Sequence, residues 1–320
     1  MLHFMKQTRR EFVRTLFVAT QATVIGSLLP RSLLADDVKN GGLNFVVIGD
    51  WGRNGEKDQL EVSQQMAAAA DESGAKLVIS VGDNFYENGV ASVDDPQWQS
   101  SFENVYTAPS LQVPWHAVLG NHDYHLDCEA QLAYSKTSKR WNMPAHYYTR
   151  TERIDAENTV DFFFLDTMPM ASFDNDEVKF RDKVPWHDVP KQMAWLKSEL
   201  AASTAPWKIV IGHHPVYSGG MHGDTPYLVK HVLPLLQKYK VQAYINGHDH
   251  DLQHLQAGRV NLFCSGAGSK PRKPKETVHT KFAKGCSGFM AVALQPDKMD
   301  VRMIDDQGNL LYTFAVPRSA

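Results

Sequence analysis

Five short motifs in the sequence each place an oxygen or nitrogen ligand directly after an apolar stretch that ends in glycine. They are Gly49-Asp50-Trp51-Gly52, Gly82-Asp83-Asn84-Phe85-Tyr86, Gly120-Asn121-His122-Asp123, Gly212-His213-His214-Pro215 and Gly247-His248-Asp249-His250. One such motif alone is ordinary turn chemistry, since Gly-Asp and Gly-Asn are common in turns. Five in succession predict one shared site, because sites in open α/β sheets form outside the carboxyl ends of the strands.

The ligand types in these motifs predict a site for two metal ions. Seven side chains offer oxygen or nitrogen atoms: Asp50, Asp83, Tyr86, Asn121, His213, His248 and His250. Carboxylate oxygens combined with imidazoles suit iron, manganese or zinc. Seven ligands exceed the needs of one tetrahedral ion, and a pair of ions about 3.5–4 Å apart serves phosphoester hydrolysis.

Apolar stretches rich in β-forming residues predict the strands that carry these motifs. They cover residues 43–48, 76–81, 115–119, 160–165, 207–211, 241–245, 260–264, 289–294 and 310–316. Apolar residues at helical spacing predict helices over residues 56–72, 190–202 and 227–239. This alternation indicates an α/β fold, and the scarcity of helices near the C-terminus predicts a partly antiparallel sheet. Residues 122–158, 168–188 and 266–286 are expected to be irregular.

The five motifs, in this order, resemble the metallophosphoesterase (calcineurin-like) superfamily and, more narrowly, the purple acid phosphatases. General metallophosphoesterases have D-x-H in the first motif, whereas this chain has Asp50-Trp51-Gly52. Tyr86 follows Asp83 by three residues, as in the GDxxY motif of purple acid phosphatases. The resemblance extends roughly from Leu43 to His250 and is greatest to the small single-domain type, which includes the mammalian tartrate-resistant enzymes.

The resemblance implies a fold and a metal centre. The implied fold is a β-sandwich of mixed sheets flanked by helices, with the dimetal site at the C-terminal ends of the strands. Fe(III) would be held by Asp50, Tyr86 and His250. A divalent ion (Fe, Zn or Mn) would be held by Asn121, His213 and His248, with Asp83 bridging the two ions.

Two further histidines match family positions that act on the substrate. His122 follows the ligand Asn121, and His222 lies on the glycine-rich loop of residues 218–223. An imidazolium can bind phosphate or protonate the leaving alkoxide. The predicted reaction is therefore hydrolysis of small phosphate monoesters by an acid phosphatase. The alternatives are a dimetal phosphodiesterase or nucleotidase on the same scaffold and a non-hydrolytic metal or phosphate binder.

Several neighbouring residues carry weaker expectations. Asp249 and His254 are expected to orient ligands, His214 to touch substrate, and Asp123 and His125 to lie at the rim. The basic segment of residues 270–275 is expected to be a solvated surface loop. Cys264 and Cys286, which flank this loop, are candidates for a disulfide, but their spacing does not decide whether they pair.

The N-terminal segment predicts export. Thr8-Arg9-Arg10-Glu11-Phe12-Val13-Arg14 resembles a twin-arginine signal, and the apolar residues 15–29 are fewer than the roughly 18 of a membrane span. A cleavage site after Ala35 would leave one phosphatase domain, residues 36–320, in the periplasm or outside a bacterial cell. Its partner before cleavage would be the Tat export machinery. The other interpretation is an amphipathic helix or a retained anchor.

Composition excludes several other classes of protein. With 320 residues, 43% hydrophobic residues and three cysteines, the chain is neither disordered nor a disulfide scaffold. Removal of residues 1–35, which hold five basic residues and one acidic residue, moves the formal net charge from −3 to −7. This balance argues against nucleic-acid binding by bulk charge, so an anionic substrate must be attracted locally. The expected mature protein is a monomer without a membrane span.

Overall fold

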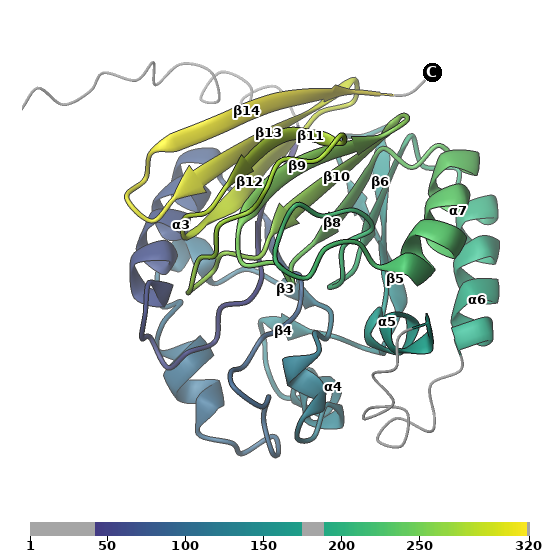
Figure 1. Cartoon of the computed structure of the whole chain (residues 1–320). Helices are drawn as coiled ribbons and strands as arrows, with labels where there is room; N and C mark the ends of the chain where they lie inside the picture. The colour runs from purple at the N-terminus through teal and green to yellow at the C-terminus, as the bar shows by residue number, and fades with distance from the viewer. Residues whose placement is uncertain (1–41, 175–188, 319–320) are drawn as a thin grey trace, which may run out of the picture. The chain divides into compact units, whose positions relative to one another are not determined.

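The computed structural model describes residues 42–174 and 189–318, so the predicted export signal and its cleavage site lie outside the described residues. The described strands form two seven-stranded sheets (Figure 1). The strand order is β14-β13-β12-β1-β2-β3-β4 in the first sheet and β11-β9-β10-β8-β7-β6-β5 in the second. In the first sheet, strands β1 to β4 are parallel neighbours, and β1, β12, β13 and β14 are antiparallel neighbours. In the second sheet, parallel neighbours at the centre are flanked by antiparallel neighbours at both edges.

The strands of the first sheet are β1 (Leu43–Ile48), β2 (Leu77–Ser80), β3 (Trp115–Ala117), β4 (Trp141–Asn142), β12 (Gly288–Leu294), β13 (Lys298–Asp305) and β14 (Leu310–Pro317). Those of the second sheet are β5 (Tyr148–Arg153), β6 (Thr159–Phe164), β7 (Trp207–Ile211), β8 (Ala243–Asn246), β9 (Leu252–Ala257), β10 (Val260–Ser265) and β11 (Thr280–Lys284). Strands β1, β2, β8, β10 and β12 are buried at every position, as expected for strands covered on both faces.

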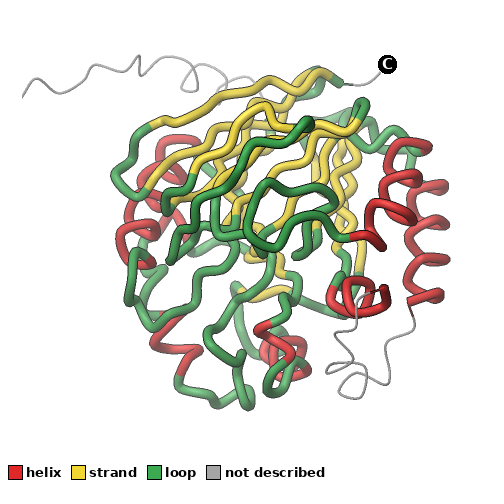
Figure 2. Tube along the Cα trace, viewed as in Figure 1, coloured by secondary structure: helices red, strands yellow, loops and turns green. Residues whose placement is uncertain are grey.

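Helices lie beside the sheets, as Figure 2 shows in red. They are α3 (Gln59–Ser73), α4 (Glu129–Tyr134), α5 (Met168–Asp174), α6 (Val189–Ala202) and α7 (Leu233–Lys238), with short helical turns at Trp98–Glu103, Pro109–Leu111, His122–Tyr124 and Leu228–Val232. Helix α3 ends at Gly74, whose left-handed backbone (φ 63°) lets its amide bond the carbonyl of Ala70.

Two apolar layers hold these elements together. The layer between the sheets includes Phe45 of β1 and Phe162 of β6, whose rings meet edge to face at 5.5 Å. Leu196 of α6 and Leu236 of α7 belong to a second cluster with Val210 of β7, so these helices cover the other face of the second sheet. The expected α/β sandwich of mixed sheets flanked by helices is confirmed.

The stretches expected to be irregular contain several elements. Residues 122–158 include α4, β4 and β5, residues 168–174 form α5, and residues 280–284 form β11. Strand β5 carries the polar sequence TRTER at the edge of its sheet, where one face is solvated, so no apolar run marks it. No helix of the described residues is long and apolar enough to cross a membrane.

Candidate metal centre

The seven expected ligands converge where the strands of both sheets end. Asp50 follows β1, Asp83 follows β2, and Asn121 lies four residues past the end of β3. From the second sheet, His213 follows β7 and His248 follows β8. Because these strands run parallel within their sheets, their carboxyl ends bring the five loops to one edge.

One half of the cluster surrounds the phenol of Tyr86. Its hydroxyl oxygen lies 3.0 Å from Asp50 Oδ1, 2.8 Å from Asp83 Oδ2 and 3.0 Å from His250 Nε2. Asp50 Oδ1 and His250 Nε2 are themselves 3.5 Å apart. The ligand atoms of Asp50, Asp83 and His250 lie within 4.8 Å of one another, close enough to hold one metal ion.

The other half of the cluster surrounds the side-chain amide of Asn121. Asn121 Oδ1 is 3.2 Å from His213 Nε2 and 2.9 Å from His248 Nδ1, and the two ring nitrogens are 3.2 Å apart. Asp83 Oδ1 lies 3.5 Å from His213 Nε2, while its other oxygen faces Tyr86. Asp83 therefore contacts ligand side chains of both halves.

Backbone carbonyls orient two of the imidazoles. His213 Nδ1 lies 2.9 Å from the carbonyl of Val81, and His250 Nδ1 lies 2.9 Å from that of Lys270. An Nδ1–H that donates to a carbonyl leaves the Nε2 lone pair facing the cluster. This is the arrangement by which metal-binding histidines are commonly fixed.

The electrostatics of the cluster suit bound cations. Burial, reinforced by the neighbouring charge of Asp83, raises the pKa of Asp50 well above its ordinary value. Burial lowers the pKa of His213 and His248, and it lowers that of His250 to about 3, so burial favours the neutral form of these rings. Two buried carboxylates beside neutral imidazoles form a donor set whose negative charge a metal ion would balance.

Close backbone packing explains the glycines that precede the ligands. The residues Asp50, Asp83 and His248 adopt positive φ angles of 59°, 49° and 71°, so the ligands themselves take the left-handed conformation. Among the preceding residues Gly82 also has a positive φ (91°), whereas at Gly247 a Cβ atom would overlap Asp50 Oδ2. Glycine is thus required at position 247 because the Asp50 carboxylate packs directly against its backbone.

The two histidines expected to act on substrate lie on either side of this cluster. The backbone amide of His122 donates to Asp83 Oδ1 at 2.8 Å, and its ring Nε2 is 4.0 Å from Asp83 Oδ2. The exposed ring of His222 lies 4.2 Å from that of His248. Arg272 holds this ring, with a guanidinium nitrogen 2.9 Å from His222 Nε2.

The basic segment of residues 270–275 is tied to the cluster as well as solvated. The amide of Arg272 donates to the carbonyl of His250 at 2.6 Å, and that of Lys275 donates to Gly219 at 2.7 Å. The segment therefore links His250 to the loop that carries His222. The interpretation as a surface loop alone was incomplete.

Asp123 is a buried support rather than a rim residue. It is fully buried and accepts hydrogen bonds from the backbone amides of Asn84, Phe85 and Gly120. Burial, together with the charge of Asp83, raises its pKa to about 7. Asp123 joins the second and third motif loops, and the sequence signal was its place within the third motif.

The other secondary expectations fare differently. Asp249 accepts hydrogen bonds from Ser218 and from the amide of His222, so it anchors the glycine-rich loop. His254 contacts Tyr312 and Asn261, and no contact of its ring with an expected ligand appears in the described residues. His214 is buried, and the centre of its ring lies 4.5 Å from the centre of the His248 ring. The ring of His125 stacks on that of His122, with 5.4 Å between their centres.

Two features of the cluster's surroundings were not settled by the sequence. Arg53 lies with its guanidinium carbon 3.6 Å from the centre of the Tyr86 ring and also pairs with Glu87, a placement that no motif signals. Cys128, Cys264 and Cys286 all lie in the described part of the chain and are free thiols, so the candidate disulfide is not formed.

Comparison with known proteins decides the family. The family model described as calcineurin-like phosphoesterase matches residues 43–252. Purple acid phosphatase 7 of Arabidopsis thaliana is 39% identical over 307 residues, covering 90% of each chain. The chain belongs to the purple acid phosphatases of the calcineurin-like phosphoesterase family. Tartrate-resistant acid phosphatase type 5 of Sus scrofa is 37% identical, covering 87% of this chain and 88% of its own.

Membership of this family indicates both the enzyme class and the fold of the chain. It confirms the predicted class of metal-dependent phosphoric monoester hydrolase, and the Asp50, Asp83 and His250 cluster agrees with a metal site. A solved structure of GAP50, described as the anchor in the inner membrane complex of Plasmodium, is 25% identical. It superposes with a TM-score of 0.78, covering 88% of this chain and 90% of that one.

Proposed function

We propose that this protein is an exported acid phosphatase that hydrolyses small phosphate monoesters at an Fe(III)–divalent metal centre. The observation that carries the proposal is the position of the Tyr86 hydroxyl oxygen, within 3.0 Å of atoms of Asp50, Asp83 and His250. A phenol ordinarily ionises near pH 10, and a ferric ion in this position would ionise it at working pH.

The seven side chains divide naturally between two ions. Asp50, Tyr86 and His250 would hold Fe(III), and Asn121, His213 and His248 would hold Fe(II), Zn(II) or Mn(II), with Asp83 shared. When bound, the two ions supply a hydroxide nucleophile and neutralise charge on the phosphoryl oxygens. The chain's own contribution is to fix the donors in place and to exclude bulk water, since Asp50, Asp83 and His213 are buried.

His122 is positioned to donate a proton to the leaving group. Its Nδ1 lies 2.6 Å from the carbonyl of Glu87, which orients the ring and leaves Nε2 toward Asp83. The side chain is 27% exposed, so a proton can return to it from solvent. His222, with Arg272 beside it, would bind the phosphate oxygens from the side of His248.

A comparison of turnover on a monoester and a diester tests this reaction. We expect the metal-loaded protein to hydrolyse 4-nitrophenyl phosphate much faster than bis(4-nitrophenyl) phosphate at equal concentration. Faster cleavage of the diester would overturn the proposal in favour of a phosphodiesterase. The absence of turnover on both esters and on nucleoside monophosphates would favour a non-hydrolytic metal or phosphate binder.

Export is the part of the proposal that rests on residues 1–35 alone. A fusion of this segment to a reporter that is active only when folded before export should reach the periplasm of a bacterium with a working twin-arginine pathway. Replacement of Arg9 and Arg10 by lysine should hold the reporter in the cytoplasm, and replacement of Lys6 by arginine serves as the matched control. Export that survives loss of the arginine pair would contradict the twin-arginine assignment.

A further inference from the structure

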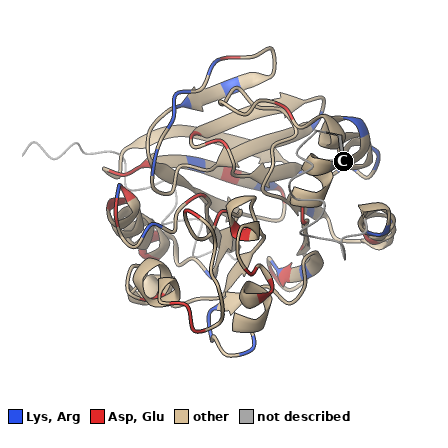
Figure 3. Ribbon diagram, turned by 60° about the horizontal axis from the view of Figure 1, so that its bottom comes forward, with Lys and Arg blue, Asp and Glu red and all other residues tan. Residues whose placement is uncertain are grey.

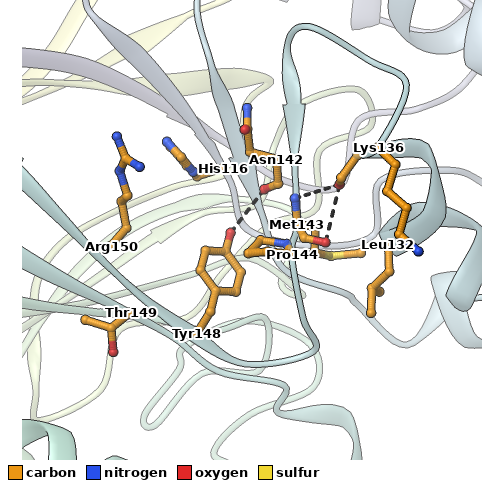
Figure 4. Close-up of a pocket in the computed structure, with 10 residues that line it drawn as sticks. His116, Leu132, Lys136, Asn142, Met143, Pro144, Tyr148, Thr149 and Arg150 are labelled. Carbon is orange, nitrogen blue, oxygen red and sulfur yellow. Dashed lines mark hydrogen bonds between the residues drawn. The ribbon is translucent and has the colours of Figure 1, made fainter.

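A pocket whose lining includes none of the expected metal ligands lies at the side where the two sheets end. Strand β4 is the edge of the first sheet and β5 is the edge of the second. Between them, residues of β3, the end of α4, β4 and β5 enclose a volume of about 480 Å³ (Figure 4). This volume lies within the range of about 300–1,000 Å³ typical of small-molecule sites. None of its lining residues is an expected metal ligand.

The walls of this edge pocket are held by hydrogen bonds. The Tyr148 hydroxyl on β5 lies 2.9 Å from the carbonyl of Ala117 and 3.2 Å from that of Asn142, so it ties the second sheet to the first. The amide of Met143 donates to Ser135 Oγ at 2.8 Å, which fixes the end of α4 against β4. The pocket is therefore formed in advance rather than opened by a ligand.

His116 lines the edge pocket with a nearly buried imidazole ring. The residue is only 6% exposed, and its Nδ1 is buried without a hydrogen-bond partner. Burial, aided by the charge of Arg150, lowers the pKa of this imidazole to about 4, so the ring is neutral near pH 7. Because Nδ1 is out of reach of solvent, a molecule bound in the pocket can contact this imidazole only at the part of the ring that remains exposed.

The remaining lining is cationic on two sides and apolar between them. Figure 4 shows Arg150 and His116 on one side of the pocket and Lys136 with Leu132 on the other. Arg150 uses Nε to bond Glu152 at 2.6 Å, so its two terminal nitrogens are not committed to that pair. Met143 and Pro144 supply apolar surface. Basic and acidic residues are interspersed along the ribbon in Figure 3.

We propose that the edge pocket is a binding site for a small organic anion with an apolar body. Its charged oxygens would accept hydrogen bonds from His116 and Arg150. Its apolar part would lie against Met143, Pro144 and the methylene chain of Lys136. The site is separate from the metal centre, so the proposal stands or falls independently of the proposed phosphatase activity.

Crystals of the metal-loaded protein soaked with 4-bromobenzoate test the location. The anomalous signal of bromine should appear in the edge pocket, and the neutral 4-bromobenzyl alcohol should give a much weaker signal there. A bromine signal confined to the metal centre or to the surface, or equal signals for the two compounds, would overturn the proposal.

Calorimetric titration of the same protein with 4-bromobenzoate tests the residues. Loss of the guanidinium charge and its hydrogen bond should weaken binding by about tenfold in Arg150→Gln. Loss of the ring N–H should also weaken binding in His116→Phe, which keeps a ring but has no donor. Lys197→Gln, which removes an exposed lysine on α6, should leave the affinity unchanged. Arg150 is exposed, so Arg150→Gln should fold normally and remains informative even where His116→Phe folds poorly. Equal affinities for wild type and Arg150→Gln would contradict the assignment.

Discussion

Replacement of Asp123 tests how the chain holds its second and third motif loops together. The Asp123 carboxylate accepts the backbone amides of Asn84, Phe85 and Gly120 at 3.1, 3.2 and 2.8 Å. The carboxylate also accepts from the buried Gln131 Nε2 at 2.8 Å. Each buried donor left without an acceptor costs about 1–3 kcal/mol, so Asp123→Ala, which orphans four, would lose about 4–12 kcal/mol. This loss is comparable to the whole stability of a domain.

Asp123→Asn is therefore the informative variant. One oxygen remains to accept the amides of Asn84 and Phe85, while the new NH₂ group faces the amide of Gly120. One orphaned donor predicts a loss of about 2 kcal/mol in the free energy of unfolding, within the range for one buried unpaired group. We also expect weaker metal retention, because Gly120 immediately precedes the expected ligand Asn121.

Urea unfolding of the metal-loaded protein measures the loss, and metal content after dialysis measures retention. Asp94→Asn is the matched control, because it makes the same chemical change at an exposed carboxylate. A change of less than about 0.5 kcal/mol in Asp123→Asn, the usual range for surface substitutions, together with normal metal retention, would refute the reasoning.

Three further substitutions follow from the geometry. His122→Ala should lower kcat by about 10²–10⁴, the usual worth of a general acid, with metal content unchanged; an unchanged kcat would remove its role as proton donor. Gly247→Ala should reduce metal content, because the added Cβ would overlap Asp50 Oδ2. Gly223→Ala, where a Cβ meets no atom but the backbone φ of +72° makes alanine strained, should still retain both ions. Burial lowers the pKa of His254 to about 4 from its ordinary 6.5. The unfolded chain therefore takes up this proton first, and stability falls as the pH falls, by about 2 kcal/mol between pH 7 and 5. In urea unfolding, the free energy of unfolding of His254→Gln should depend less on pH than that of the wild type. An identical pH dependence would show that burial of His254 does not cause the loss of stability at low pH.

The strands that carry ligands were predictable because they are apolar and end in glycine. Strands β1, β7 and β10 were predicted nearly to the residue, since central strands buried on both faces form continuous apolar runs. Strand β9, with the sequence LQHLQA, was missed because its buried polar residues are satisfied by tertiary contacts such as Gln253 to Ser218. Sequence periodicity does not register such contacts.

The order of the motifs predicted the ligand residues, whereas it did not predict the residues that hold the ligands in place. Nothing in the spacing of Asp123 distinguishes a buried acceptor of three amides from a residue at the rim. Arg53 and Arg272 reach Tyr86 and His222 only because separate loops fold over the cluster. Such contacts join residues far apart in the chain, so a single sequence carries no local trace of them.

The central claim is that Tyr86 is a ligand of Fe(III) in a two-metal centre. The visible absorption spectrum of the purified protein, read together with its metal content, tests this most directly. We predict a coloured protein containing iron and a second metal ion, with a charge-transfer band that disappears in Tyr86→Phe while the protein stays folded. A colourless, iron-free wild-type protein, or a band that persists in Tyr86→Phe, would contradict the account.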